Sequence, residues 1–113
     1  MPPIQKLEDS LRNTFVCADP GTDAQYIAEL MNDVRQNMCS PFELSAVVSE
    51  PGFPGNRQRA VGAIISAVCV AHRAGYWLVY DQGRDEFLCF SGVSQERLTA
   101  PGIYGGALYC WTA

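Results

Sequence analysis

The feature that most constrains this chain is a pair of apolar segments in its second half, YWLVY at 76–80 and FLCF at 87–90. Both are rich in aromatic residues and short enough to be single β-strands joined as a hairpin. Because successive side chains of a strand point to opposite faces, each face of this hairpin carries large apolar groups. A sheet face in water is normally polar, so we expect both faces to be covered. The cover has to be the chain's own helices, a second copy of the chain or a ligand.

The turn of the hairpin sets its register. Centred on the Gly-Arg pair at 83–84, it suits a type II′ turn, which favours glycine at its first central position. This turn predicts Tyr80 opposite Phe87 and, towards the tip, Asp81 opposite Glu86. Two acids that face each other destabilise a hairpin, which leaves a frayed tip as one interpretation. A four-residue turn would keep the same pairs.

Two amphipathic helices are predicted in the first forty residues. Apolar residues recur at helical spacing from Ile4 to Phe15, and this helix should end near Thr14. The segment 22–25, Thr-Asp-Ala-Gln, is a capping box that begins a second helix. The apolar stripe of this helix consists of Ile27, Leu30, Met31, Val34 and Met38. The Ser-Pro pair at 40–41 ends it, because a residue before proline is pushed out of helical geometry.

The remaining segments complete an α-α-β-α-β-β-β order. Apolar residues alternate with mostly polar ones over 42–49, which predicts a half-buried strand, and residues 50–56 read as a loop. Residues 60–71 are small or apolar on nearly every side, which is typical of a central helix, and we assign this helix to 57–74. After a further loop, the last strand is predicted at 104–111.

These elements predict a single α+β domain over residues 1–113. We expect a small antiparallel sheet of three or four strands packed against two or three helices. The hairpin and the last strand should form a meander, with the strand at 42–49 either joined at an edge or lying across from them. With 113 residues, 48% of them hydrophobic, the chain is long enough to bury one core.

The net charge of −4 is unevenly distributed. Residues 1–56 hold eight acids against three bases, whereas residues 57–113 hold four acids against five arginines. An acidic chain without a basic run repels phosphate backbones, so we expect no nucleic-acid partner. A basic protein is a more natural partner. Glu29 and Asp33 on the outer face of the second helix are the predicted docking residues, with a solvated face as the alternative.

Five widely spaced cysteines and one histidine do not predict a metal site or a cofactor, because zinc sites normally contain short pairs such as Cys-x-x-Cys. Cys69 and His72 lie three residues apart in the last two turns of the predicted central helix, where the helix dipole disfavours a thiolate, so we assign no catalytic residue. The odd number of cysteines and the polar N-terminus predict free thiols in a cytoplasmic protein. The longest apolar run, about 12 residues, is below the ~18 that a membrane helix needs, so no membrane partner is expected.

Two kinds of binding site remain as alternatives. In the first, Trp77 and Tyr80 anchor a contact with a partner or a second copy, because aromatic side chains often anchor interfaces. In the second, a pocket lies between the helix at 57–74 and the aromatic sheet, lined by His72, Trp77 and Tyr80. Arg57 would join this pocket from the start of the helix, where a glycine-bearing loop favours anions.

The lack of a reactive cluster favours a non-enzymatic binding protein that forms a homodimer and binds a basic protein. In size, acidity and thiol content the chain resembles small accessory proteins of bacterial mobile elements, such as immunity proteins and antitoxins. The alternative function is that of a small-molecule-binding protein or an enzyme that uses the pocket beside the aromatic sheet.

Overall fold

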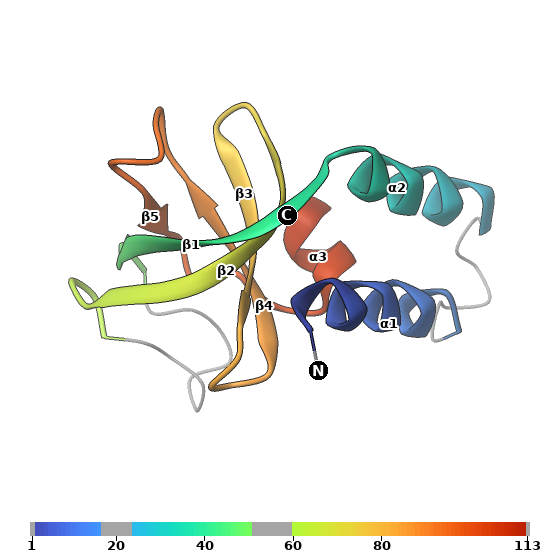
Figure 1. Cartoon of the computed structure of the whole chain (residues 1–113), viewed down its shortest axis with the longest axis horizontal. Helices are drawn as coiled ribbons and strands as arrows, with labels where there is room; N and C mark the ends of the chain where they lie inside the picture. Colours follow the sequence, from blue (N-terminus) through green and yellow to red (C-terminus); the bar gives the residue numbers. More distant parts are fainter. Residues whose placement is uncertain (1, 17–23, 51–59, 113) are drawn as a thin grey trace.

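The structure is a computed structural model that describes residues 2–16, 24–50 and 60–112. Three helices are present in these ranges: α1 (Pro3–Val16), α2 (Ala24–Gln36) and α3 (Ala107–Thr112). The strands are β1 (Met38–Val48), β2 (Ile64–Arg73), β3 (Tyr76–Asp81), β4 (Glu86–Ser91), β5 (Thr99–Ala100) and β6 (Tyr104–Gly105). The three helices lie together on one side of the strands (Figure 1).

The six strands form one mixed sheet in the order β3-β2-β1-β5-β4-β6, and β3 also pairs with β4. The pairings therefore run in a ring from β1 through β2, β3, β4 and β5 back to β1, so the sheet closes on itself. All of these pairs are antiparallel except β1 with β5, which is parallel and joins Val47 to Thr99 and Val48 to Ala100. Closure gives most strands a neighbour on both sides.

The buried side chains separate into two clusters, one on each face of this closed sheet. The inner cluster comes from the strands and the segment before β5: Leu44, Ala46, Val48, Ala67, Cys69, Trp77, Val79, Leu88, Phe90, Leu98, Ala100 and Tyr104. The outer cluster joins the sheet to the helices: Leu7, Leu11, Ile27, Met31, Val34, Val70, Ala71, Leu78, Tyr80, Phe87, Ala107, Leu108, Cys110 and Trp111. Burial of both faces is the driving force that holds the two layers together.

The β3–β4 hairpin has the predicted register. Tyr80 lies opposite Phe87, and the pairing continues to Asp81 opposite Glu86 at the tip. The turn holds four residues, 82–85, with Asp85 in the left-handed conformation at a φ of 51°. Asp81 Oδ1 accepts hydrogen bonds from the backbone N–H of residues 83 and 84, which stabilises the turn. Both faces of the hairpin are covered, as predicted, and the chain itself supplies the cover.

The predicted sheet of three or four antiparallel strands is wrong, because the sheet has six strands and is mixed. The α-α-β-α-β-β-β order is wrong for the same reason and because the segment assigned to a central helix at 57–74 contains β2. Residues 67, 69, 70 and 71 of β2 are buried, on both faces of the sheet. A strand buried on both faces has the same all-round apolar pattern as a buried helix, so hydrophobic periodicity does not separate the two.

The predicted last strand at 104–111 is also wrong. Gly105, at a φ of +136°, ends β6 after two residues, and α3 follows. Ser10 Oγ of α1 accepts a hydrogen bond of 2.9 Å from the Ala107 backbone N–H and so satisfies a donor in the first turn of α3. Leu108 and Trp111 lie three residues apart and share the buried face of this helix.

The two N-terminal helices are confirmed, but the second ends earlier than predicted. Asn37 Nδ2 donates a hydrogen bond of 2.8 Å to the Asp33 carbonyl oxygen at the end of α2. Met38 then begins β1 and does not extend the helix. Pro41 lies inside this strand, where the register of β1 and β2 shifts between Met38 and Phe42. An irregularity of this kind tolerates a residue that has no N–H to donate.

Candidate functional site

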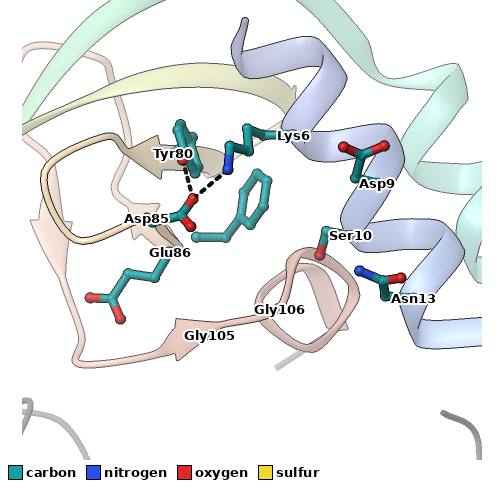
Figure 2. Close-up of a pocket in the computed structure, with 10 residues that line it drawn as sticks. Lys6, Asp9, Ser10, Asn13, Tyr80, Asp85, Glu86, Gly105 and Gly106 are labelled. Atoms are coloured by element: carbon teal, nitrogen blue, oxygen red, sulfur yellow. Dashed lines mark hydrogen bonds and ion pairs between the residues drawn. The ribbon is translucent and has the colours of Figure 1, made fainter. Parts of the chain in front are cut away.

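A pocket of about 620 Å³ opens between α1 and the tip of the β3–β4 hairpin (Figure 2). Its described lining comes from three places: Lys6, Asp9, Ser10 and Asn13 on α1, Tyr80, Asp85, Glu86 and Phe87 on the hairpin, and Gly105 and Gly106 before α3. The α1 residues recur at spacings of three and four, so they share one face of the helix. Leu7 and Leu11 beside them point into the outer cluster and fix this face over the hairpin.

A three-residue polar network spans the mouth of the pocket. Lys6 Nζ lies 3.0 Å from Asp85 Oδ1, and the Tyr80 hydroxyl donates a hydrogen bond to the same carboxylate (Figure 2). The bond from Tyr80 and the bond from Lys6 both hold the pKa of Asp85 below its ordinary value. Burial, followed by the bond to Asp85, raises the pKa of Tyr80 to about 12, so Tyr80 remains a neutral donor at physiological pH. The network keeps a carboxylate ionised beside the pocket.

The charge of the lining is negative. Its three carboxylates belong to Asp9, Asp85 and Glu86, and Lys6 is the one cation among the lining residues. The Glu86 residue is only 5% exposed, whereas the Asp85 side chain is 65% exposed. The rings of Tyr80 and Phe87 lie 5.1 Å apart, centroid to centroid, beside these carboxylates. Carboxylates next to aromatic rings suit a cationic group, which gains from both.

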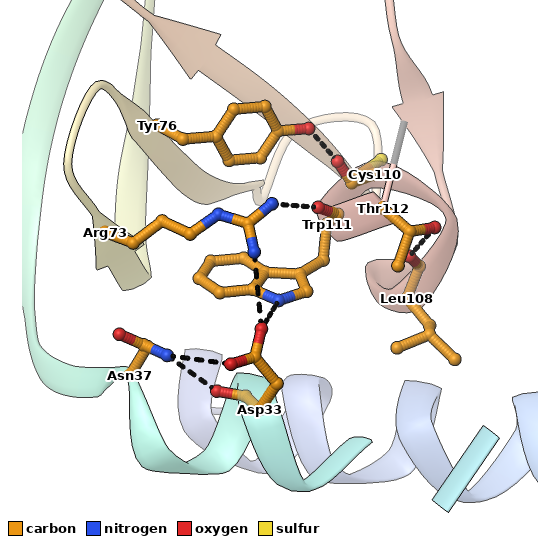
Figure 3. Close-up of polar contacts among 8 residues, drawn as sticks. All are labelled: Asp33, Asn37, Arg73, Tyr76, Leu108, Cys110, Trp111 and Thr112. Atoms are coloured by element: carbon orange, nitrogen blue, oxygen red, sulfur yellow. Dashed lines mark hydrogen bonds and ion pairs between the residues drawn. The ribbon is translucent and has the colours of Figure 1, made fainter. Parts of the chain in front are cut away.

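The two acids predicted to dock a partner have different surroundings. Glu29 is exposed on α2 and accepts a bond of 3.4 Å from Gln25 Nε2. Asp33 Oδ2 accepts a bond of 2.8 Å from the Trp111 indole N–H and lies 3.3 Å from the Arg73 guanidinium (Figure 3). Asp33 therefore joins α2 to α3 and to the end of β2, and its carboxylate is engaged within the chain.

Arg73 completes this joint between the helices and the sheet. Its guanidinium lies over the indole of Trp111, 4.4 Å from the ring centroid, and donates a bond of 3.1 Å to the Trp111 carbonyl oxygen. The ring of Tyr76 packs edge-on against the same indole, and the Tyr76 hydroxyl donates to the Cys110 carbonyl oxygen (Figure 3). Trp111 is fully buried, so these contacts hold α3 against the sheet.

The residues predicted to form a pocket beside the aromatic sheet are not brought together. Trp77 belongs to the inner cluster and is 6% exposed, whereas Tyr80 belongs to the outer cluster and lines the pocket under α1. His72 pairs with Trp77 across β2 and β3, but its side chain is exposed and packs edge-on against Phe42. Arg57 lies outside the described residues. The predicted helix that was to form one wall is the strand β2.

Sequence reasoning missed most residues of the observed pocket. Lys6 and Asp85 are separated by most of the chain, and no local spacing connects them. One feature of the sequence could have indicated Lys6. It is the only lysine, and it lies on the polar side of a helix whose opposite side is apolar. A second feature could have indicated Asp85, which lies at the hairpin turn, because aspartate adopts the left-handed conformation more readily than most residues.

No protein-family model, no curated protein and no solved structure matches this chain. Within residues 2–16, 24–50 and 60–112, no group of three or more His, Cys, Asp or Glu side chains gathers as metal ligands would. In the same part of the chain no helix is both long enough and apolar enough to cross a membrane.

Proposed function

We propose that this chain is a non-enzymatic binding protein whose pocket under α1 receives a cationic side chain, lysine or arginine, of a basic partner protein. The observation that carries the proposal is the lining of that pocket, where the carboxylates of Asp85 and Glu86 lie with Lys6 and two aromatic residues, while the third acid, Asp9, is paired with Arg12. A guanidinium or ammonium group gains charge-assisted hydrogen bonds from the carboxylates.

The pocket is a better docking place than the outer face of α2. Three carboxylates of the first two helices already have arginine partners: Glu8 with Arg35, Asp9 with Arg12 and Asp33 with Arg73. These pairs reduce the negative field that the uneven charge distribution predicts for the helices. Asp85 is more available, because its pair with Lys6 is exposed, and exposed ion pairs contribute only about 0–1 kcal/mol. A cation of the partner can therefore replace Lys6 beside Asp85 at little cost in free energy.

A titration with two cationic probes tests the proposal. The full chain is titrated by calorimetry with a pentalysine peptide and, separately, with the free polyamine spermidine. We expect the peptide to bind, with an affinity that falls as salt is added. Asp85→Asn should weaken this binding by about threefold. Glu96→Gln removes one exposed negative charge at another surface and is the matched control.

The outcomes separate the proposal from its rival. Equal weakening by Asp85→Asn and Glu96→Gln, or binding that salt does not change, would contradict the pocket as the site. Stronger binding of spermidine than of the peptide would favour the small-molecule alternative. Glu29→Lys tests the remaining contribution of the α2 face, whereas a change at Asp33 disturbs the joint with Trp111.

Self-association and a cytoplasmic location belong to the same proposal. An exposed apolar pair, Val47 with Ile64, lies beside a groove of about 430 Å³ that Leu98 also lines, and this surface suits a second copy. The four cysteines of the described ranges, Cys39, Cys69, Cys89 and Cys110, are free thiols, which supports a reducing compartment. A small acidic accessory protein of the immunity or antitoxin type would have these properties.

A further inference from the structure

Two cysteine side chains meet where β1 and β2 lose their regular pairing. The Sγ atom of Cys39 lies 3.9 Å from the Sγ atom of Cys69, and it also lies 3.9 Å from the Cys69 carbonyl oxygen. The register of the two strands shifts between Met38 and Phe42, so Cys39 stands in the irregular stretch of β1. Neither sulfur takes part in the pocket under α1.

The geometry is close to that of a disulfide. A disulfide holds its sulfurs about 2.05 Å apart, so the two Sγ atoms need to approach by about 2 Å. Cys69 is paired with Phe42, and Cys39 lies three residues earlier on β1, so the two thiols approach each other across the irregular stretch. The irregular stretch of β1 is where a small adjustment disturbs the fewest ladder hydrogen bonds.

The two thiols differ in access to solvent. Cys69 is fully buried in the inner cluster, whereas Cys39 is half-buried and packs against that cluster from its edge. A reagent in solution therefore reaches Cys39 first. Burial raises the pKa of both thiols, and that of Cys69 is raised to about 12 by burial and by the neighbouring Cys39. Exchange should accordingly be slow at neutral pH and faster in mildly alkaline solution.

We propose that Cys39 and Cys69 form a redox-active dithiol that a low-molecular-weight disulfide converts into an intramolecular disulfide. Cys39 loses its proton to solvent and attacks one sulfur of the small disulfide. The S–S bond of the small disulfide breaks, and one thiolate leaves and takes up a proton. Cys69 then loses its proton and attacks Cys39 Sγ, so the mixed disulfide breaks and the second small thiol leaves. Two electrons pass from the two cysteines to the small disulfide, which becomes two thiols.

The experiment uses the full reduced chain in mildly alkaline buffer, with oxidised glutathione as the probe. Intact-mass and peptide mapping should find a loss of about 2 Da and a bond between Cys39 and Cys69. The cross-link closes a loop across 30 residues of sequence, so we expect Tm to rise by at least about 5 °C. Dithiothreitol should reverse both changes.

Alanine variants separate the roles of the two thiols. In Cys69→Ala we expect one glutathione to remain attached to Cys39, because no second thiol displaces it. In Cys39→Ala we expect no adduct on the buried Cys69. Cys89→Ala, which removes another buried cysteine on β4, should oxidise as the wild type does. Peptide mapping of the wild type does not depend on any variant being folded. A stable glutathione adduct on Cys39 of the wild type, or a bond from Cys39 to a cysteine other than Cys69, would overturn the proposal.

Discussion

The joint around Trp111 yields a prediction whose size follows from the structure. Asp33→Ala removes the acceptor of the Trp111 indole N–H, and Asp33 Oδ2 is the acceptor that the structure assigns to it, at 2.8 Å. Trp111 is fully buried, so Asp33→Ala leaves its indole N–H without an acceptor from the protein. The same change breaks the pair of Asp33 with Arg73. Asp33→Asn keeps an oxygen acceptor and removes only the charge.

The expected cost is the sum of two effects of different size. An unsatisfied buried donor costs about 1–3 kcal/mol. The pair between Asp33 and Arg73 contributes about 0–1 kcal/mol, because both side chains are nearly half exposed. Asp33→Ala should therefore lower the free energy of unfolding by about 1–4 kcal/mol, and Asp33→Asn by about 1 kcal/mol or less. Asp33→Ala should also loosen α3, since Trp111 is the largest of the four buried residues of this helix.

Urea unfolding followed by tryptophan fluorescence measures these differences, with the unchanged slope of the transition as a check on two-state behaviour. Glu29→Ala is the control, because Glu29 lies one turn earlier on the same helix and is exposed. Its change should be within about 0.5 kcal/mol. If Asp33→Ala and Glu29→Ala lower the free energy of unfolding by the same amount, Asp33 is a surface acid as the sequence suggested. The joint between Asp33 and Trp111 is then refuted.

Three further predictions concern the strands. Gly92→Ala places a Cβ against the Arg97 carbonyl oxygen, so urea unfolding should show a loss of about 2 kcal/mol or more, whereas Gly83→Ala, which meets only a side chain, should be nearly neutral. Burial holds the pKa of Tyr80 at about 12, above its ordinary 10.0, so its contribution to stability is complete below pH 10 and is lost between pH 10 and 12. Tyr80→Phe should make the urea midpoint less dependent on pH in that range. Ile64 is 74% exposed, and Ile64→Asp should reduce a dimer to a monomer in light scattering, whereas an unchanged mass would refute this surface as the interface.

Local patterns predicted the parts of the fold that local physics decides. The β3–β4 hairpin has its predicted register because a turn and two alternating apolar runs specify which residues face each other. The first two helices were found because each has one apolar stripe and one polar side, which is a helical period and no other. The alternation of side chains between the two faces of the hairpin also predicted that both faces would be covered.

The errors arose where packing at long range decides the structure. Residues 67–71 of β2 are apolar on both sides because the closed sheet covers both faces of this part of the strand, and the local sequence does not reveal that the sheet closes. The six residues of α3 are too few to show a helical period, and Ser10 on α1 supplies the bond that begins this helix. The pocket depends on Lys6 meeting Asp85, which only the docking of α1 on the hairpin brings about.

The closing strand β5 and the contact between α1 and α3 have a consequence for synthesis of the chain. β1 can pair with β5 only after Thr99 and Ala100 have left the ribosome. The hydrogen bond between α1 and α3 can form only after Ala107 has emerged. The sheet therefore closes only after β5 has emerged, and α3 bonds to α1 only after that. Until these segments have emerged, the growing chain exposes the apolar β3–β4 hairpin, which chaperones recognise during synthesis.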